Sequence, residues 1–152
     1  MLSLTKKTEY ALIAVCHLAR SQREVVSARD IAARSAVRLP LLMNVLKALN
    51  QSGLLASVRG ARGGYRLAVP AKTITLAALI AAVEMPVRLV RCAPPRVAAR
   101  PRCELSESCP IRAPVHKLHG MLNNLLTQVT VADFAFDAGY SDAGQALKAV
   151  GK

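Results

Sequence analysis

Acidic residues are scarce in this 152-residue chain, which has nine Asp and Glu against 21 Lys and Arg and a net charge of +12. Long apolar runs are also lacking. The longest, Leu76–Val83, has eight residues against the roughly 20 that a transmembrane helix needs, so we expect no membrane span. Yet 53% of the residues are hydrophobic, too many for a disordered basic tail. We expect one domain, or a small domain with an appendage, built around a true core.

The chain also lacks the usual signs of export and of catalysis. Its N-terminus has no apolar signal segment and no cleavage site, so we predict a cytoplasmic protein whose four cysteines are thiols or metal ligands. There is no Cys-x-x-Cys pair, hydrolase triad, phosphate loop or metalloprotease helix. These absences argue against a thiol oxidoreductase, an iron–sulfur electron carrier or any other enzyme.

The positive charge is concentrated in the first half of the chain. Residues 1–72 carry twelve basic and three acidic groups, a net charge of +9, whereas residues 73–152 have a net charge of only +3. A polyanion such as nucleic acid is the leading explanation, with general solubility as the alternative.

The first half also has the pattern of helix, short strand, helix, helix and hairpin. Apolar residues at helical spacing predict a helix after Thr5, and Ser27 is placed to cap a second helix that ends near Ser35. Pro40 suits the start of a third helix, which Gly53 ends. Residues 24–26 are predicted as a short strand, and residues 54–59 and 65–69 as the two strands of a hairpin around a glycine-rich turn.

This order predicts a winged helix-turn-helix, whose third helix enters the major groove of DNA while the hairpin, the wing, lies along the phosphates or in the minor groove. The third helix presents polar residues opposite its apolar stripe, and the wing carries arginines around its turn. Arg62, at the tip, is the best single DNA contact. The candidate DNA-binding residues are Met43, Asn44, Lys47, Gln51, Arg59, Arg62 and Arg66. The alternative for each helix residue is an ordinary solvated surface.

The second half predicts a short helix up to Pro86, a proline-rich loop over residues 87–110 and a long helix that starts near Pro114. Apolar residues in this helix follow at alternating steps of three and four, which is typical of a coiled-coil seam and indicates a homodimer. The seam residues are Val115, Leu118, Leu122, Leu125 and Val129. The alternative is packing within one chain.

Overall we predict a mainly α fold with a small β-hairpin. The predicted parts are a winged helix-turn-helix over 1–72, a linker helix, cysteine loop and dimerisation helix over 73–136, and a flexible tail over 137–152.

Three cysteines, Cys92, Cys103 and Cys109, lie in the proline-rich loop among several arginines. Neighbouring thiolates repel one another and oxidise easily, and a bound metal relieves both problems. Soft sulfur ligands admit zinc or iron–sulfur chemistry, and the lack of a close cysteine pair favours an iron–sulfur cluster over zinc. Cys16, alone in the first helix, is interpreted as a small buried apolar residue.

A fourth ligand is needed beside the three cysteines. His116 and His119 follow on the long helix, and Glu9 lies near the start of the first helix. A residue at the position of Glu9 is equally explained as an acid favoured by the helix dipole, so the fourth ligand stays open on local grounds.

Four parts of the sequence form a recognisable set: the opening residues 4–11, the wing residues 57–67, residues 74–76 and the three loop cysteines. Together they resemble the Rrf2 family of bacterial winged-helix transcription regulators, which includes IscR, NsrR and RirA. The opening and the wing are most similar to its SUF-operon branch, and the resemblance covers about residues 2–133.

The resemblance implies a homodimeric repressor or activator that binds double-stranded promoter DNA and holds a [2Fe-2S] or [4Fe-4S] cluster on its three cysteines. Of the two, we predict a repressor. In some members an acid from the partner's first helix completes the site, and Glu9 matches that position. The implied signal is iron–sulfur status, redox state or nitric oxide. The alternative is a winged-helix regulator with structural zinc or a cluster-free thiol switch.

Three positions depart from the family pattern. Arg112 stands where members with a histidine ligand carry that histidine, and the gap between the first two cysteines is longer than usual. Met43 replaces a glutamate that some members use on the recognition helix, so their operator sequence does not carry over to this chain.

Overall fold

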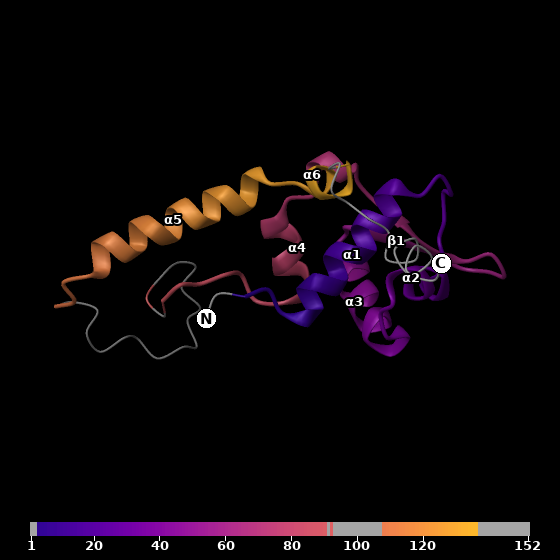
Figure 1. Cartoon of the computed structure of the whole chain (residues 1–152), viewed down its shortest axis with the longest axis horizontal. Coiled ribbons are helices and arrows are strands. Elements are labelled where there is room, and N and C mark those ends of the chain that lie inside the picture. Colours follow the sequence, from indigo (N-terminus) through magenta and orange to yellow (C-terminus); the bar gives the residue numbers. More distant parts are fainter. Residues whose placement is uncertain (1–2, 91, 93–107, 137–152) are drawn as a thin grey trace, which may run out of the picture.

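The computed structural model describes residues 3–90, 92 and 108–136. Its elements are α1 (Lys6–Arg20), α2 (Ala28–Ser35), α3 (Leu39–Gln51), β1 (Leu55–Val58), β2 (Gly64–Leu67), the 3-10 turn η1 (Ala71–Thr73), α4 (Leu76–Val83), α5 (Arg112–Gln128) and α6 (Val131–Phe136). Figure 1 shows a compact body of helices from which the wing extends at one end and α5 at the other. None of the helices in the described ranges is long and apolar enough to cross a membrane.

The predicted order of helices and hairpin is confirmed, and side-chain caps set several boundaries. The hydroxyls of Thr5, Ser27 and Thr75 accept hydrogen bonds from backbone N–H groups in the first turns of α1, α2 and α4. The predicted strand over 24–26 reduces to one bridge, between Val26 and Tyr65. Helix α5 begins two residues before Pro114, because a proline in the first turn sacrifices no helical hydrogen bond.

One hydrophobic core joins both halves of the chain. Leu42, Leu46 and Leu49 of α3 are fully buried beside α1, and Leu79 of α4 and Val131 of α6 belong to the same cluster. Helix α1 packs between α6 on one side and α3 on the other (Figure 1). The core therefore continues across the boundary near residue 72 that charge and composition suggest.

The wing is an antiparallel hairpin in which Leu55 pairs with Leu67 and Val58 with Gly64. Its base is tied to the chain before α2, because the N–H groups of Val26 and Tyr65 each donate to the other residue's carbonyl, at 3.0 and 2.8 Å. At Gly64 the two backbones approach so closely that a Cβ would lie 2.3 Å from the Val26 carbonyl oxygen. Only glycine allows this contact.

We predict that Gly64→Ala destabilises the protein by about 2 to 3 kcal/mol, because the added methyl meets backbone atoms that cannot rotate away. Gly120→Ala is the control. Gly120 lies in α5 with nothing within 4 Å of a built Cβ, so its substitution is expected to stabilise by roughly 0.5 to 1 kcal/mol. Urea unfolding curves of both variants check the pair, and equal effects would contradict the close approach.

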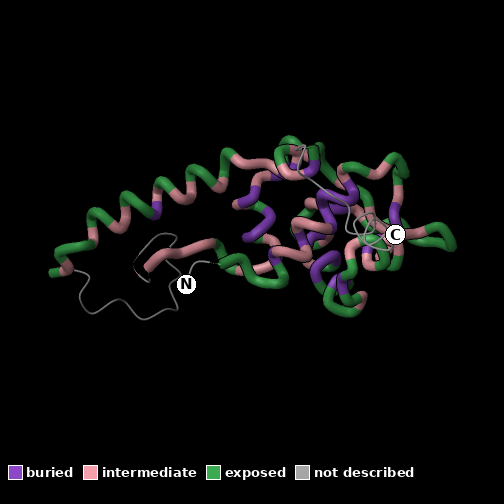
Figure 2. The backbone as a smooth tube through the Cα atoms, viewed as in Figure 1, coloured by how far each residue is buried: buried purple, intermediate pink, exposed green. Residues whose placement is uncertain are grey.

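Helix α5 has little burial for its length. Of its 17 residues only His119 is buried, and Figure 2 shows its outer half mostly exposed or half-buried. A stripe of large apolar side chains is exposed along it, here called the α5 stripe. It consists of Ile111 just before the helix and Leu118, Met121 and Leu125 within it, each more than half exposed.

The α5 stripe overlaps the predicted seam without coinciding with it. Leu118 and Leu125 belong to both. Leu122 instead lines a cavity with residues of α1 and α4, and Val129 packs against the core as the residue that ends α5. Val115 is half-buried. Which of these residues contact a second subunit stays a prediction.

Candidate DNA-binding surface and cysteine site

Helix α3 presents a polar face because its apolar residues are used on the other side. Leu42, Val45, Leu46 and Leu49 face the core, which leaves the opposite side of the helix to solvent. The four candidates on this helix are all exposed: Met43, Asn44, Lys47 and Gln51. Two donors of different kinds, an amide and an ammonium, thus lie on the exposed side of α3.

The wing carries its arginines on a short, fixed turn. Gly60 has a φ of +118°, a conformation that glycine adopts readily, and the Gly63 N–H donates to the Gly60 carbonyl at 2.9 Å. Arg59, Arg62 and Arg66 are exposed, and no ion pair in the described part of the chain involves them. Their charge is therefore available to an anionic partner.

The cysteines are only partly described. Cys92 and Cys109 are free thiols of intermediate exposure, whereas Cys103 and most of the predicted loop lie outside the described residues, as does the predicted tail over 137–152. Cys92 ends the described part of the coil that follows α4, and Cys109 stands three residues before α5. Both are accessible enough to meet a ligand or an oxidant.

The three candidates for the fourth ligand lie in different surroundings. Glu9 is in the first turn of α1, where its carboxylate pairs with the Lys6 ammonium at 2.6 Å and remains 39% exposed. This ion pair raises the pKa of Lys6. His116 is half-buried on α5, and His119 is buried. Nε2 of His119 accepts a hydrogen bond from the amide nitrogen of Asn123 at 2.9 Å, since that nitrogen can only donate.

Within the described residues, no group of three or more His, Cys, Asp and Glu side chains gathers as a metal site. Within these residues, Cys92 and Cys109 do not form a three-ligand site with either histidine. The donors nevertheless fit iron in their chemistry, because two thiols of intermediate exposure offer soft sulfur and the partly exposed Glu9 offers a carboxylate.

Cys16 has the buried position predicted for it. It is 1% exposed in α1, and burial raises the pKa of its thiol to about 11. Since the thiolate is the reactive form, Cys16 is expected to resist iodoacetamide at pH 7 while Cys92 and Cys109 are modified. Peptide mass spectrometry of native and urea-unfolded protein checks this, and rapid native labelling of Cys16 would contradict it.

Comparisons with known proteins agree with one another. The profile of the Rrf2 family, described as an iron-dependent transcriptional regulator, matches residues 4–137. The chain is similar to the HTH-type transcriptional regulator IscR of Vibrio vulnificus, with 31% identity over 90% of this chain and 79% of that protein.

Two solved structures show the same fold. CymR, the global cysteine regulator of B. subtilis, has a TM-score of 0.68 and 26% identity, covering 89% of this chain and 97% of its own. IscR of T. potens has a TM-score of 0.66 and 26% identity, covering 92% and 93%. The winged-helix architecture predicted from the sequence is therefore confirmed, and the named relatives are regulators rather than enzymes.

Proposed function

Because the chain belongs to the Rrf2 family of transcriptional regulators, we propose that it is a homodimeric repressor whose DNA affinity is set by an iron–sulfur cluster on its cysteine loop. As a member of this family it regulates transcription and is not an enzyme. One observation carries the finer proposal. The exposed face of α3 and the wing, here called the reading surface, carries basic groups that form no ion pair in the described residues, and the same chain holds Cys92 and Cys109 as partly exposed free thiols.

The reading surface is proposed to act in two grooves at once. In the major groove, the Asn44 amide suits adenine, Lys47 suits guanine or a phosphate, and Met43 suits a thymine methyl. Gln51 extends the same face. In the minor groove, the guanidinium groups of Arg59 and Arg62 are drawn to the negative potential of a narrow groove, and Arg66 faces the backbone beside it.

The cluster is proposed to lie on Cys92, Cys103 and Cys109, with Glu9 of the partner subunit as fourth ligand. When bound, a [2Fe-2S] or [4Fe-4S] cluster supplies a centre that responds to iron–sulfur status, oxidants or nitric oxide. Glu9 can be recruited at little cost, because its ion pair with Lys6 is exposed on both sides and such pairs contribute little. A ligand from the partner would tie α1 of one subunit to the cysteine loop of the other and so fix the distance between the two reading helices.

The homodimer is supported by the α5 stripe. Ile111, Leu118 and Leu125 follow at intervals of seven, with Met121 between the last two, which is the spacing of a coiled-coil seam. Helix α5 projects from the body of the chain (Figure 2), and its apolar stripe is exposed. Such a stripe can pack against α5 of a second subunit across a twofold axis.

A second candidate is a cluster-free thiol switch on the same scaffold. It is favoured by the likeness to CymR, a cysteine regulator, together with the accessible thiols of Cys92 and Cys109. In this case oxidation of the thiols, rather than cluster loss, would change the DNA affinity. Structural zinc on the same cysteines is the remaining alternative.

Anaerobic purification with absorption spectra and counts of iron, acid-labile sulfide and zinc separates these candidates. We expect a coloured protein with iron and sulfide in equal amounts, and a colourless one from Cys92→Ala. Cys16→Ser is the control that keeps the colour, because Cys16 is buried in α1. A colourless protein without iron or sulfide would overturn the cluster proposal, and zinc alone would establish the structural site.

DNA binding is tested separately with the promoter of the protein's own gene. Affinity is expected to fall steeply as salt rises, because basic groups displace counterions from the phosphates.

The Glu9→Ala variant tests the ligand role of Glu9 alone. An unchanged cluster spectrum would remove Glu9 from the site while leaving the rest of the proposal intact.

A further inference from the structure

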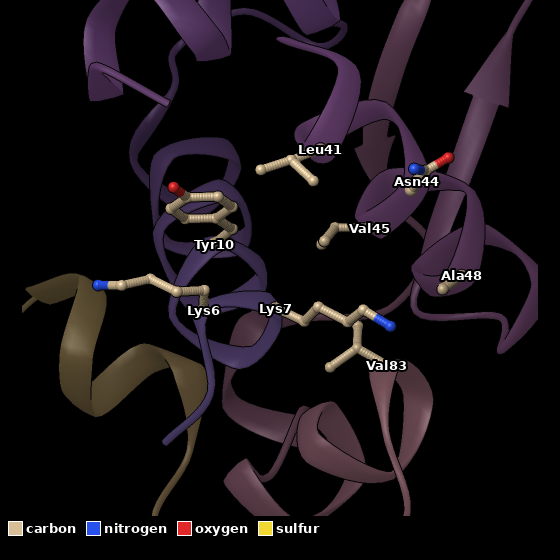
Figure 3. Close-up of a pocket in the computed structure, with 8 residues that line it drawn as sticks. All are labelled: Lys6, Lys7, Tyr10, Leu41, Asn44, Val45, Ala48 and Val83. Atoms are coloured by element: carbon tan, nitrogen blue, oxygen red, sulfur yellow. The ribbon is translucent and has the colours of Figure 1, made fainter. Parts of the chain in front are cut away.

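A groove lies beside α3, and of the residues that line it only Asn44 belongs to the DNA-binding surface assigned above. Figure 3 shows it between the start of α1, one flank of α3 and the end of α4. It measures about 150 Å³, and its floor is apolar, with Leu41, Val45 and Ala48 of α3 and Val83 of α4. Lys6, Lys7 and Tyr10 of α1 line the opposite side together with Asn44.

Every polar side chain that lines this groove can donate a hydrogen bond, and none of them is an acid. Lys7 forms no ion pair in the described part of the chain, and its ammonium points along α3 toward Ala48 and Val83 (Figure 3). The Tyr10 hydroxyl lies nearer Leu41, whereas the Lys6 ammonium points away from Lys7 and pairs with Glu9. The donors are thus spread along the flank of α3, the direction in which a DNA strand would run if α3 entered the major groove.

We infer that this groove binds the sugar-phosphate backbone of the strand that borders the major groove, with Lys7 as its main phosphate contact. The inference rests on the proposed placement of α3 in DNA. The apolar floor suits the carbon face of a deoxyribose, and the donors at the rim suit its phosphate. Asn44 stands on both surfaces and joins the backbone contact to base reading.

A small effector molecule is the weaker occupant. The groove is smaller than the roughly 300 to 1,000 Å³ of sites that enclose such ligands. The groove is also flanked by the exposed side chains of Lys6, Lys7 and Asn44, so it is a surface feature that a strand can follow.

The test compares Lys7→Ala with Lys72→Ala in the full chain. Lys72 is an exposed lysine on η1, which packs against α6 on the side of α1 away from α3 (Figure 1). Binding to operator and to unrelated duplex DNA is measured over a range of salt, so that both affinity and its salt dependence are obtained.

Lys7→Ala is expected to weaken binding to both DNAs by about tenfold and to lower the salt slope by about one per subunit. Lys72→Ala is expected to change neither. If Lys7→Ala leaves affinity and slope unchanged while Asn44→Ala weakens operator binding, the groove is not a backbone contact although α3 still reads DNA. If the wild type binds no DNA above background, the proposed function itself fails.

Tyr10→Phe is a second variant that removes only one hydroxyl from the rim. It is expected to weaken both DNAs by a few fold without changing the salt slope, since no charge is lost. Loss of operator binding with unchanged binding to unrelated DNA would overturn the backbone assignment, because phosphate contacts are insensitive to sequence.

Discussion

Replacing Leu118 and Leu125 together by glutamate is expected to give a folded monomer that binds operator DNA at least 100-fold more weakly than the wild type. Both side chains are about 55% exposed in one chain, so the substitutions cost the fold of that chain little. In a dimer paired through the α5 stripe, they place four carboxylates in an apolar seam. Burying an unpaired carboxylate costs several kcal/mol per group. This cost exceeds the stabilisation that the remaining apolar contacts of the seam can provide.

The loss of DNA affinity follows from linkage of the two half-sites. Two reading helices on one dimer bind as a unit, and the second contact gains roughly 100- to 10,000-fold from its high effective concentration. A monomer keeps the same contacts at one half-site and loses this gain. Its affinity for unrelated DNA is expected to fall less, because charge alone sustains that binding.

Asn124→Glu is the matched control on the same helix. Asn124 is exposed and lies outside the α5 stripe, so one added carboxylate there is expected to leave the dimer intact. Analytical ultracentrifugation gives the oligomeric state, and circular dichroism shows that each variant is folded. A double variant that stays dimeric would refute the α5 seam and direct attention to another surface.

The N-terminal fold is predictable from the sequence because its signals are local. The helix after Thr5 and the helix capped by Ser27 form where the sequence indicates, and the glycines of the turn set the wing. Contacts between distant segments leave no such signal. Arg20 donates to the carbonyl of Ala135 at 2.9 Å, and Thr8 to the carboxylate of Glu84 at 3.1 Å. No sequence pattern links these pairs, so the return of α6 to α1 could not be foreseen.

The same distinction explains the α5 stripe. Alternating steps of three and four in the sequence select Leu118 and Leu125. This spacing does not show which side of α5 packs against the core of its own chain and which side stays exposed. The structure settles this for Val129, which packs inward, and exposes Met121 and Ile111. An interval of seven from Ile111 would have found Leu118 and Leu125, and a step of three from Leu118 would have added Met121. The groove beside α3 was missed because its residues come from three helices.

Removing the guanidinium groups of the wing is expected to produce the other large effect. Arg59→Ala and Arg62→Ala together should weaken operator binding by about 100-fold, since each charge-assisted contact contributes about tenfold. The salt slope should fall by about one per arginine and subunit. Stability should stay within about 0.5 kcal/mol of the wild type, because both side chains are exposed and form no ion pair in the described residues.

Comparison with Asn44→Ala separates charge from base reading. The wing variant should lose affinity on every duplex, with an added loss on sites whose minor groove is narrow, whereas Asn44→Ala should lose affinity mainly on the operator. Fluorescence anisotropy with operator, unrelated and A-tract duplexes measures all three. If the wing variant keeps its affinity on all of them, α3 alone binds DNA and the free charge of the wing serves another partner.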